Sequence, residues 1–254
     1  MSSLAHTASD TVVIARRNLL RIPRQPDLLM AYTIQPVMFI VLFVYVFGGA
    51  IQTPGYDYVD YLMPGILVQT IVFGSALTGV GLAEDMHKGL MDRFRSLPMA
   101  RSAVLAGRTA ADVVTNAFQT LVMLVVAYIV GFRFSTSVPE VVLGLVLLLL
   151  TGYAFSWISA LIGMSVNSVE AAQSAGFIWM FPLTFVSSAF VPTDSMPAAL
   201  EWFAEINPIT IWVNALRGLF VGAPLDGEVW QGVLWIVAVF APLAVAKYRR
   251  IATA

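Results

Sequence analysis

Residues 141–150 read VVLGLVLLLL, and nine of these ten residues are Val or Leu. Each Val or Leu near the centre of a helix favours membrane insertion by about 0.3 to 0.6 kcal/mol, so this stretch alone favours insertion by several kcal/mol. The apolar sequence continues to residue 165 and is longer than the roughly 20 residues that a helix needs to cross the hydrocarbon core. We therefore predict a transmembrane helix over residues 141–165.

Five further stretches have a similar length and apolar character. They cover residues 28–47, 62–83, 109–130, 171–191 and 229–246. The third, 109–130, is the weakest, because Asp112, Asn116 and Gln119 lie in its first half. Hydrophobic residues make up 59% of the chain and charged residues only 11%, against roughly 25% charged residues in soluble proteins. A compact soluble fold cannot bury that much apolar surface at this length, so we predict an all-α integral membrane protein with six transmembrane helices.

The basic residues give an independent indication of the number of spans. Twelve of the 14 Lys and Arg residues lie in residues 16–24, 88–108 and 247–250, and only Arg133 and Arg217 lie elsewhere. Six spans place these three segments on one side, which the positive-inside rule assigns to the cytoplasm, whereas five or seven spans would separate them. The basic cluster 16–24 also precedes the first apolar run, unlike a cleavable signal peptide. We expect a multi-pass protein of the cell membrane with both termini in the cytoplasm.

The apolar region between the fifth and sixth spans does not fit a further span. Asn207-Pro208 divides it into pieces over 196–206 and 209–221, which are too short to cross a bilayer and suit re-entrant or interfacial helices. Glu201, Glu205 and Arg217 would have to face water or protein there. We predict an extracellular helical hairpin over residues 192–228 that dips into the outer leaflet. The alternative is a structured outer loop with incidental helix.

Two amphipathic segments are predicted on the cytoplasmic side. Residues 1–26 combine apolar positions with a row of Arg, as in an interfacial helix, which either anchors the first span or has a mechanical role. In residues 84–101, one apolar stripe at helical spacing consists of Met86, Leu90, Phe94 and Leu97. A short charged helix with an aromatic on its apolar side is suited to docking on a soluble partner. The alternative for this second segment is a basic loop held against anionic lipid.

The sequence carries no pattern for catalysis, metal binding or ion coupling. The chain has no Cys, and its two His residues lie far apart in the sequence, which argues against a metal site. It has no G-x-x-x-x-G-K-[ST] phosphate-binding run. Acidic residues lie near span ends, and the span centres carry neutral polar residues such as Gln35 and Gln69, whereas a proton-driven carrier would bury ionisable groups near mid-membrane. A separate motor protein is therefore the favoured source of energy.

Several short motifs along the chain are informative through their order and their spacing. They are Tyr61-Leu62-Met63-Pro64-Gly65-Ile66, Glu84-Asp85, Gly89, Asp92-Arg93-Phe94-Arg95-Ser96-Leu97-Pro98, Asn207-Pro208 and Asn214-Ala215-Leu216-Arg217. With these motifs, essentially the whole chain resembles the permease subunits of type-2 ABC exporters, and specifically the daunorubicin/doxorubicin-resistance permease group. The resemblance implies that residues 27–254 form one six-span type-2 ABC transmembrane domain, in which 84–101 is the coupling helix.

The resemblance also implies partners and site residues. The partners are two copies of a cytoplasmic ABC ATPase, a second permease copy or similar subunit, and membrane lipids; no nucleic acid is expected. ATP and Mg²⁺ are expected on the ATPase, and no cofactor on this chain. Candidate ATPase contacts are Asp85, Leu90, Arg93, Phe94, Arg95 and Leu97. In this family the first, second and fifth spans tend to line the substrate pathway, which makes candidates of Gln35, Phe39, Gln69, Phe73 and Phe177.

The expected function is therefore ATP-driven export of amphipathic drugs or lipid-like molecules across the cytoplasmic membrane. Export of a lipid-linked polysaccharide uses the same architecture and is the nearest alternative. An ion-coupled secondary transporter without an ATPase is a further alternative from a different class. A membrane enzyme has no catalytic constellation in this sequence to support it.

Overall fold

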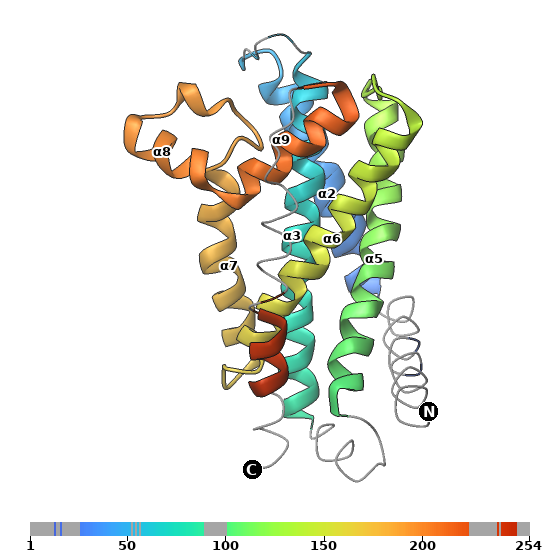
Figure 1. The fold of residues 1–254 in the computed structure, drawn as a ribbon, viewed down its shortest axis with the longest axis vertical. Helices are drawn as coiled ribbons and strands as arrows, with labels where there is room; N and C mark the ends of the chain where they lie inside the picture. Colours follow the sequence, from blue (N-terminus) through green and yellow to red (C-terminus); the bar gives the residue numbers. More distant parts are fainter. Residues whose placement is uncertain are drawn as a thin grey trace.

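The computed structural model describes residues 13, 16, 26–51, 53, 55, 57–88, 101–223, 238 and 240–247. Within these residues all regular structure is helical (Figure 1). The elements are α2 (Pro26–Val41), the π-helix η2 (Leu42–Phe47), α3 (Tyr58–His87), α5 (Arg101–Ile129), α6 (Val138–Gly163), α7 (Val169–Phe185), the short 3₁₀ helix η3 (Thr193–Ser195), α8 (Ala198–Ile206) and α9 (Pro208–Val221). The described part of the chain is thus the all-α fold that its composition predicts.

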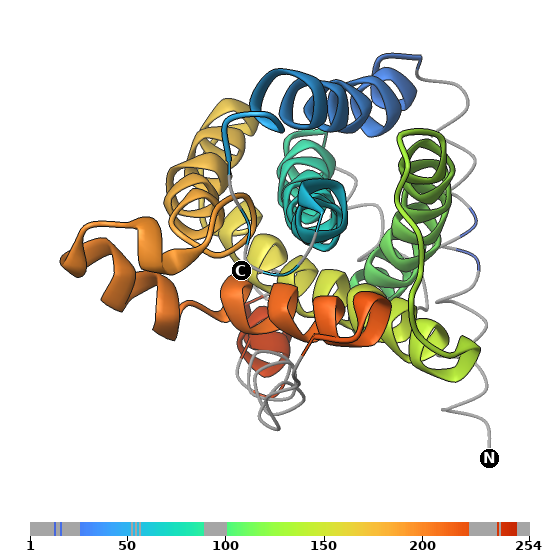
Figure 2. The ribbon, with the colours of Figure 1, turned by 90° about the horizontal axis from the view of Figure 1, so that it is seen from above.

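Helix α3 forms the centre of the bundle. Seen from above, it is surrounded by α2, α5, α6 and α7 (Figure 2). It is buried over most of its length, whereas the surrounding helices expose large apolar side chains such as Met38, Phe118 and Val142. A helix that is apolar on all sides belongs inside a bundle, and helices with apolar outer faces are suited to contact with lipid. The second predicted span is therefore the core of the molecule.

Helices α3 and α6 cross with their backbones almost in contact. A Cβ atom on Gly79 would overlap the Ser159 carbonyl group, and a Cβ on Gly163 would overlap the Gly79 backbone. Gly152 likewise lies against the Ile71 side chain. Small residues allow helices in membranes to approach this closely. The glycines of α6 at this crossing therefore pack against α3 of the same subunit.

Helix boundaries follow local capping signals. Ser137 and Glu140 form a capping box at the start of α6, in which the Glu140 carboxylate accepts hydrogen bonds from Ser137 N and Oγ at 2.8 and 2.7 Å. The Ser168 hydroxyl accepts from Ala171 N at 3.0 Å and starts α7. Asn207 Oδ1 accepts from Ile209 N at 2.9 Å and starts α9, with Pro208 in its first turn. Such caps satisfy amide groups that the first turn of a helix leaves free.

Three described helices are long and apolar enough to cross a membrane: Tyr58–His87, Gly107–Ile129 and Val138–Gly163. They correspond to the second, third and fourth predicted spans. Thr33–Phe47 and Pro208–Val221 are shorter apolar helices. Of the sixth predicted span, 229–246, only residues 238 and 240–246 are described; this helical segment packs through Ala244 beside Leu82 and Trp157. Six spans remain a prediction.

The predicted fifth span, 171–191, is longer than the helix that forms there. Helix α7 ends at Phe185, although the apolar sequence continues to Val191. The side chain of Asn207, between α8 and α9, satisfies the backbone around this end: its Nδ2 donates to the carbonyl oxygens of Leu183 and Val186 at 2.6 and 2.7 Å. Asn207 lies far along the chain, so hydropathy alone could not place the end of the helix.

The region predicted as an outer hairpin contains two helices, α8 and α9, which meet at Asn207 as expected. Arg217 on α9 is only 4% exposed and faces protein. Its guanidinium donates to the Tyr61 carbonyl at 2.9 Å, to Ser188 Oγ at 3.1 Å and to Asn214 Oδ1 at 2.8 Å, and it also donates to the Ser188 carbonyl. We refer to Tyr61, Ser188, Asn214 and Arg217 as the Arg217 cluster. It joins α9 to α3 and to the segment after α7.

Candidate substrate cavity and coupling region

A cavity of about 180 Å³ lies between α2, α3, α5 and α7. All of its lining residues are neutral, and they are mostly Gln and Phe. The lining consists of Gln35, Pro36, Phe39, Gln69, Thr70, Phe73, Gly74, Leu77, Gln119, Gln173, Phe177 and Phe181. The structure therefore brings together all five residues proposed from the sequence for the pathway. Their role in transport remains a prediction.

Three of the four helices present the same pattern to the cavity. A Gln is followed one helical turn later by a Phe in Gln35–Phe39 on α2, Gln69–Phe73 on α3 and Gln173–Phe177 on α7. Residues four apart lie on one face of a helix, so each pair contributes an amide and an aromatic ring to the same wall. This repeated spacing is a sequence signal that would have added Gln173 to the pathway candidates.

The aromatic side of the cavity is a packed group of rings. Phe73 lies 5.8 Å from Phe177 and 5.1 Å from Phe181 between ring centroids, the latter edge to face. Phe177 and Phe181 are themselves 5.7 Å apart. Offset and edge-to-face arrangements at such distances are favourable and give a firm apolar surface. A flat apolar group can pack against this surface.

The polar side of the cavity lacks internal partners. Gln69 and Gln119 are 5% and 3% exposed, yet neither side-chain amide hydrogen-bonds to another residue in the described part of the chain. Gln119 Oε1 is buried, and a Cβ atom on Gly74 would lie 3.2 Å from it. Buried polar groups are usually hydrogen-bonded, and leaving one unpaired costs about 1 to 3 kcal/mol. The cavity thus contains amide groups available to a bound molecule.

Gln119 belongs to α5, which corresponds to the third span. The sequence-based assignment considered the first, second and fifth spans as pathway helices, so it left this residue out. Gln119 lies on the same side of α5 as Asp112, seven residues earlier, and this polar stripe on an otherwise apolar helix is the signal that could have identified it.

The coupling region is described only at its two ends. Helix α3 extends to His87, so Glu84 and Asp85 belong to its last turn, and α5 begins at Arg101. The other predicted ATPase contacts, Leu90, Arg93, Phe94, Arg95 and Leu97, lie outside the described residues. Of that set, Asp85 alone can be placed, and it faces α5 rather than solvent: its side chain is 6% exposed.

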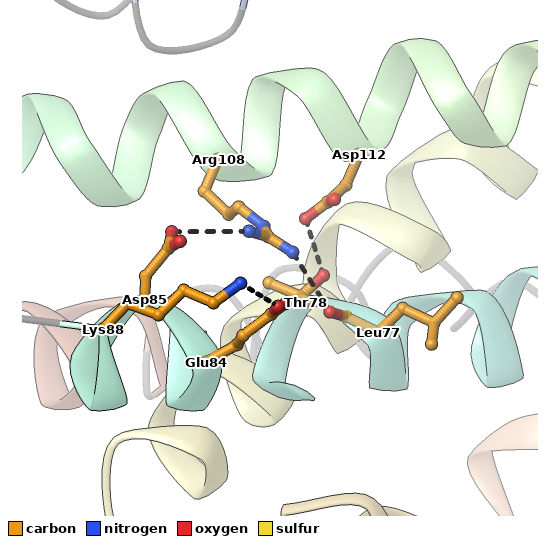
Figure 3. A network of polar contacts seen from close by, with 7 residues as sticks. All are labelled: Leu77, Thr78, Glu84, Asp85, Lys88, Arg108 and Asp112. Atoms are coloured by element: carbon orange, nitrogen blue, oxygen red, sulfur yellow. Dashed lines mark hydrogen bonds and ion pairs between the residues drawn. The ribbon is translucent and has the colours of Figure 1, made fainter. Parts of the chain in front are cut away.

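A polar network joins these two helix ends (Figure 3). Arg108 on α5 lies between Asp85 and Asp112; its Nη1 is 3.7 Å from Asp85 Oδ2, and its Nη2 donates to the Leu77 carbonyl at 3.2 Å. The Thr78 hydroxyl donates to Asp112 Oδ2 at 2.6 Å. A Cβ atom on Gly81 would overlap the Arg108 guanidinium, so the guanidinium lies directly over this glycine. We refer to Thr78, Asp85, Arg108 and Asp112 as the Arg108 network.

The Arg108 network holds together the two ends of the predicted coupling segment. Asp85 and Arg108 flank residues 89–100 on either side in the chain, and their helices also supply Gln69, Phe73 and Gln119 to the cavity. Charged pairs that are shielded from water are stronger than exposed ones, because the local dielectric is lower. The network therefore links the two helices that form two walls of the cavity.

Comparison with known proteins decides the family. The ABC-2 type transporter family model matches residues 9–221, which is most of the chain. The chain belongs to the ABC-2 type transporter family. As an ABC-2 permease it is a membrane subunit of an ABC transporter, and ATP hydrolysis in such a system comes from a separate ATPase component. The resemblance stated from the motifs is thereby confirmed.

Individual relatives are similar over nearly the whole ABC-2 permease. The daunorubicin resistance ABC transporter permease protein DrrB1 of Streptomyces coeruleorubidus is 31% identical over 248 residues, covering 96% of this chain and 88% of the relative. The probable doxorubicin resistance ABC transporter permease protein DrrC of Mycobacterium tuberculosis is 23% identical over 96% of this chain and 90% of its own length. The probable multidrug ABC transporter permease YbhR of Escherichia coli is 24% identical over 78% of this chain and 54% of its own length. These relatives support the assignment as a permease of an ABC exporter.

Proposed function

We propose that this permease exports amphipathic drugs or lipid-like molecules, and that they pass through the cavity between α2, α3, α5 and α7. The observation that carries the proposal is the neutral lining of Phe and Gln around this space. Sites for drug-sized ligands are mostly apolar with a few well-placed polar groups. The names of the relatives, which include daunorubicin, doxorubicin and multidrug permeases, support the same class of cargo.

The size of the cavity supports a pathway shared by two subunits. Its volume of about 180 Å³ is smaller than the roughly 300 to 1,000 Å³ of sites that enclose a drug-sized molecule. A single chain in this conformation therefore accommodates only part of such a molecule. We propose that a second permease copy, or a similar subunit, completes the pathway and that two ATPase subunits lie below the pair. ATP and Mg²⁺ would be bound by those ATPases.

The coupling segment is assigned on the same basis. We propose that the coupling segment, residues 84–101, docks on the ATPase on the cytoplasmic side of the cell membrane, and that the Arg108 network passes the movement to α3 and α5. The orientation follows from the basic residues, of which Lys88 and Arg108 lie at this end of the bundle. Both termini lie on the same side in the proposed six-span topology.

Transport in inside-out vesicles tests the proposal. The chain is co-expressed with its ATPase, and ATP-dependent accumulation of a fluorescent, uncharged amphipathic molecule is recorded. We expect Phe73→Ala, in the cavity, to lower the rate several-fold, because it removes a ring from the wall, whereas Phe118→Ala on the exposed face of α5 leaves it unchanged. Phe94→Asp and Arg93→Glu should abolish transport without loss of the folded protein.

Two results would contradict the proposal. Equal transport by the Phe73→Ala and Phe118→Ala variants would remove the cavity from the pathway. Accumulation that collapses with the proton gradient while ATP is maintained would instead indicate an ion-coupled transporter.

A further inference from the structure

Gln69 and Gln119 place side-chain amides without a protein partner among the described residues on one side of the cavity. They come from α3 and α5, and each is at least nine-tenths buried without a side-chain hydrogen bond to another described residue. Gln119 Oε1 lies beside Gly74, which also lines the cavity. Because Gly74 has no side chain, the Gln119 amide can pack directly against its backbone. A buried amide that pairs with nothing in its own protein is costly to maintain. Of the eight described buried side-chain atoms without a partner, Gln119 Oε1 is the one whose residue lines the cavity, where a ligand can supply partners for the amide.

The chemistry of the lining narrows the class of ligand. A Gln amide offers two N–H donors and one carbonyl acceptor, and it carries no charge. A hydrocarbon chain in this space would leave both amides unpaired, and an ionised group would lie among neutral residues without a counter-charge. A ligand with hydroxyl and carbonyl groups satisfies both the donors and the acceptor. The polar wall therefore discriminates against purely apolar and charged groups.

The size and shape of the space indicate a ring. An apolar cavity of about 150 Å³ holds a benzene molecule, so a cavity of about 180 Å³ has room for a substituted ring. Phe73, Phe177 and Phe181 provide the aromatic surface against which such a ring can pack. The amides of Gln69 and Gln119 lie among the same lining residues. One ligand group can thus meet the aromatic wall and the amide wall together.

We propose that Gln119, together with Gln69, is a specificity-determining subsite that binds an uncharged, hydroxyl- or carbonyl-bearing ring of the transported molecule. The inference rests on the proposed role of the cavity as the transport pathway, and it adds the third span to the helices that recognise cargo. Alkyl lipids without ring hydroxyl groups are poor ligands of this subsite. Discrimination of this kind is large when a site has buried polar groups that an apolar analogue leaves unpaired.

A binding measurement on the purified permease tests this subsite without the ATPase. The protein is placed in lipid nanodiscs, and equilibrium dialysis against empty nanodiscs measures the affinity for a dihydroxyflavone and for unsubstituted flavone, which share one ring system. Gln119→Leu should weaken binding of the dihydroxyflavone by about 3- to 10-fold, as expected for one lost hydrogen bond, and weaken binding of flavone, which offers the amide only its ring carbonyl, by a smaller factor. Gln69→Leu provides the same test from α3, and Phe118→Leu, on the exposed face of α5, is the matched control.

The outcomes separate this inference from the proposed function. If Phe73→Ala weakens binding of both flavones but neither Gln variant distinguishes them, the cavity is the binding site and the specificity subsite is wrong. If Phe73→Ala affects the binding of neither flavone, the cavity does not bind cargo, and the proposed function fails together with the inference. Selective loss of dihydroxyflavone binding in the Gln119→Leu variant, with the control unchanged, supports the inference.

Discussion

The cavity and the Arg217 cluster both bury polar side chains, but they differ in how those side chains are satisfied. In the Arg217 cluster, the guanidinium donates to the carbonyls of Tyr61 and Ser188 and to two side chains, and it also lies 3.6 Å from the centre of the Tyr61 ring. In the cavity, the amides of Gln69 and Gln119 have no side-chain hydrogen bond to other described residues. The first arrangement stabilises the fold, whereas the second is suited to a ligand. Seven other described buried side-chain atoms, such as Trp212 Nε1, also lack a partner, so an unpaired atom marks a candidate functional residue only where that residue also lines a cavity, as Gln119 does.

Removing the arginine of the Arg217 cluster should have the largest effect on stability. Arg217→Leu removes four hydrogen bonds donated by a buried guanidinium, although the Tyr61 hydroxyl still donates to the Ser188 carbonyl and the Ser188 hydroxyl to Asn214 Oδ1. We expect this loss to cost about 3 kcal/mol. The melting temperature of the detergent-solubilised protein, measured by scanning fluorimetry, should fall by about 5 to 10 °C. The matched control is Arg133→Leu, because Arg133 is exposed and stacks on Tyr128 at the surface. Equal shifts in melting temperature for the two variants would show that the burial of Arg217 does not account for its contribution to stability.

The second prediction concerns Asn207, which performs two separate tasks in the same region. Its Oδ1 caps α9, and its Nδ2 donates to the backbone at the end of α7. Asn207→Ala removes both and should destabilise the protein by about 2 kcal/mol, whereas Asn207→Asp retains the cap and should cost about half of that. The same melting measurement compares the two variants. If the aspartate variant is as unstable as the alanine variant, the cap contributes nothing.

The Arg108 network should affect coupling more than stability. Gly81→Ala places a methyl group where the Arg108 guanidinium lies, and the guanidinium must move away from Asp85 and the Leu77 carbonyl. We expect transport per ATP hydrolysed to fall by about 3- to 10-fold, with the melting temperature little changed. Gly176→Ala is the matched control, since its new methyl group would make an ordinary 3.4 Å contact with Ala76. Wild-type coupling in the Gly81→Ala variant would exclude this network from the coupling route.

The smallest effect on stability is expected at the cavity itself. Gln119→Leu removes a buried amide that makes no hydrogen bond to described residues, so the variant should be as stable as the original protein or slightly more stable. The melting temperature should therefore stay constant or rise by about 1 to 3 °C. A fall comparable to that of Arg217→Leu would mean that Gln119 has a structural partner, and the contrast between the two regions would disappear.

The sequence predicted the apolar helices well, because hydropathy depends on each segment alone. It also located the break between α8 and α9, since Asn207-Pro208 is a local cap. It placed the end of the fifth span too late. The side chains of Asn207 and Arg217, which are distant in the sequence, donate hydrogen bonds to the backbone carbonyl groups there. Hydropathy also does not indicate the π-helix η2, which has the same apolar composition as its surroundings.

The candidate site was predicted in part. Five residues chosen from the sequence line one cavity, and family resemblance selected the helices that bear them. Gln119 was not chosen, because its lack of a partner becomes visible only when α3 and α5 are packed together. The pairing of Arg108 with Asp85 was missed for the same reason: the two residues lie on different helices, and hydropathy does not report contacts between helices.

The crossing at Gly79 and Gly163 has a mechanical consequence. Because the backbones of α3 and α6 are in direct contact there, this crossing is a natural pivot for a tilt of α3 against α6. Asp85 and Phe73 lie at equal distances from Gly79 along the helix, about 9 Å in opposite directions. A rigid tilt of α3 about this point would move Phe73 by the same amount as Asp85 but in the opposite sense. In such a tilt, a displacement at Asp85 would appear with the opposite sense at the cavity wall.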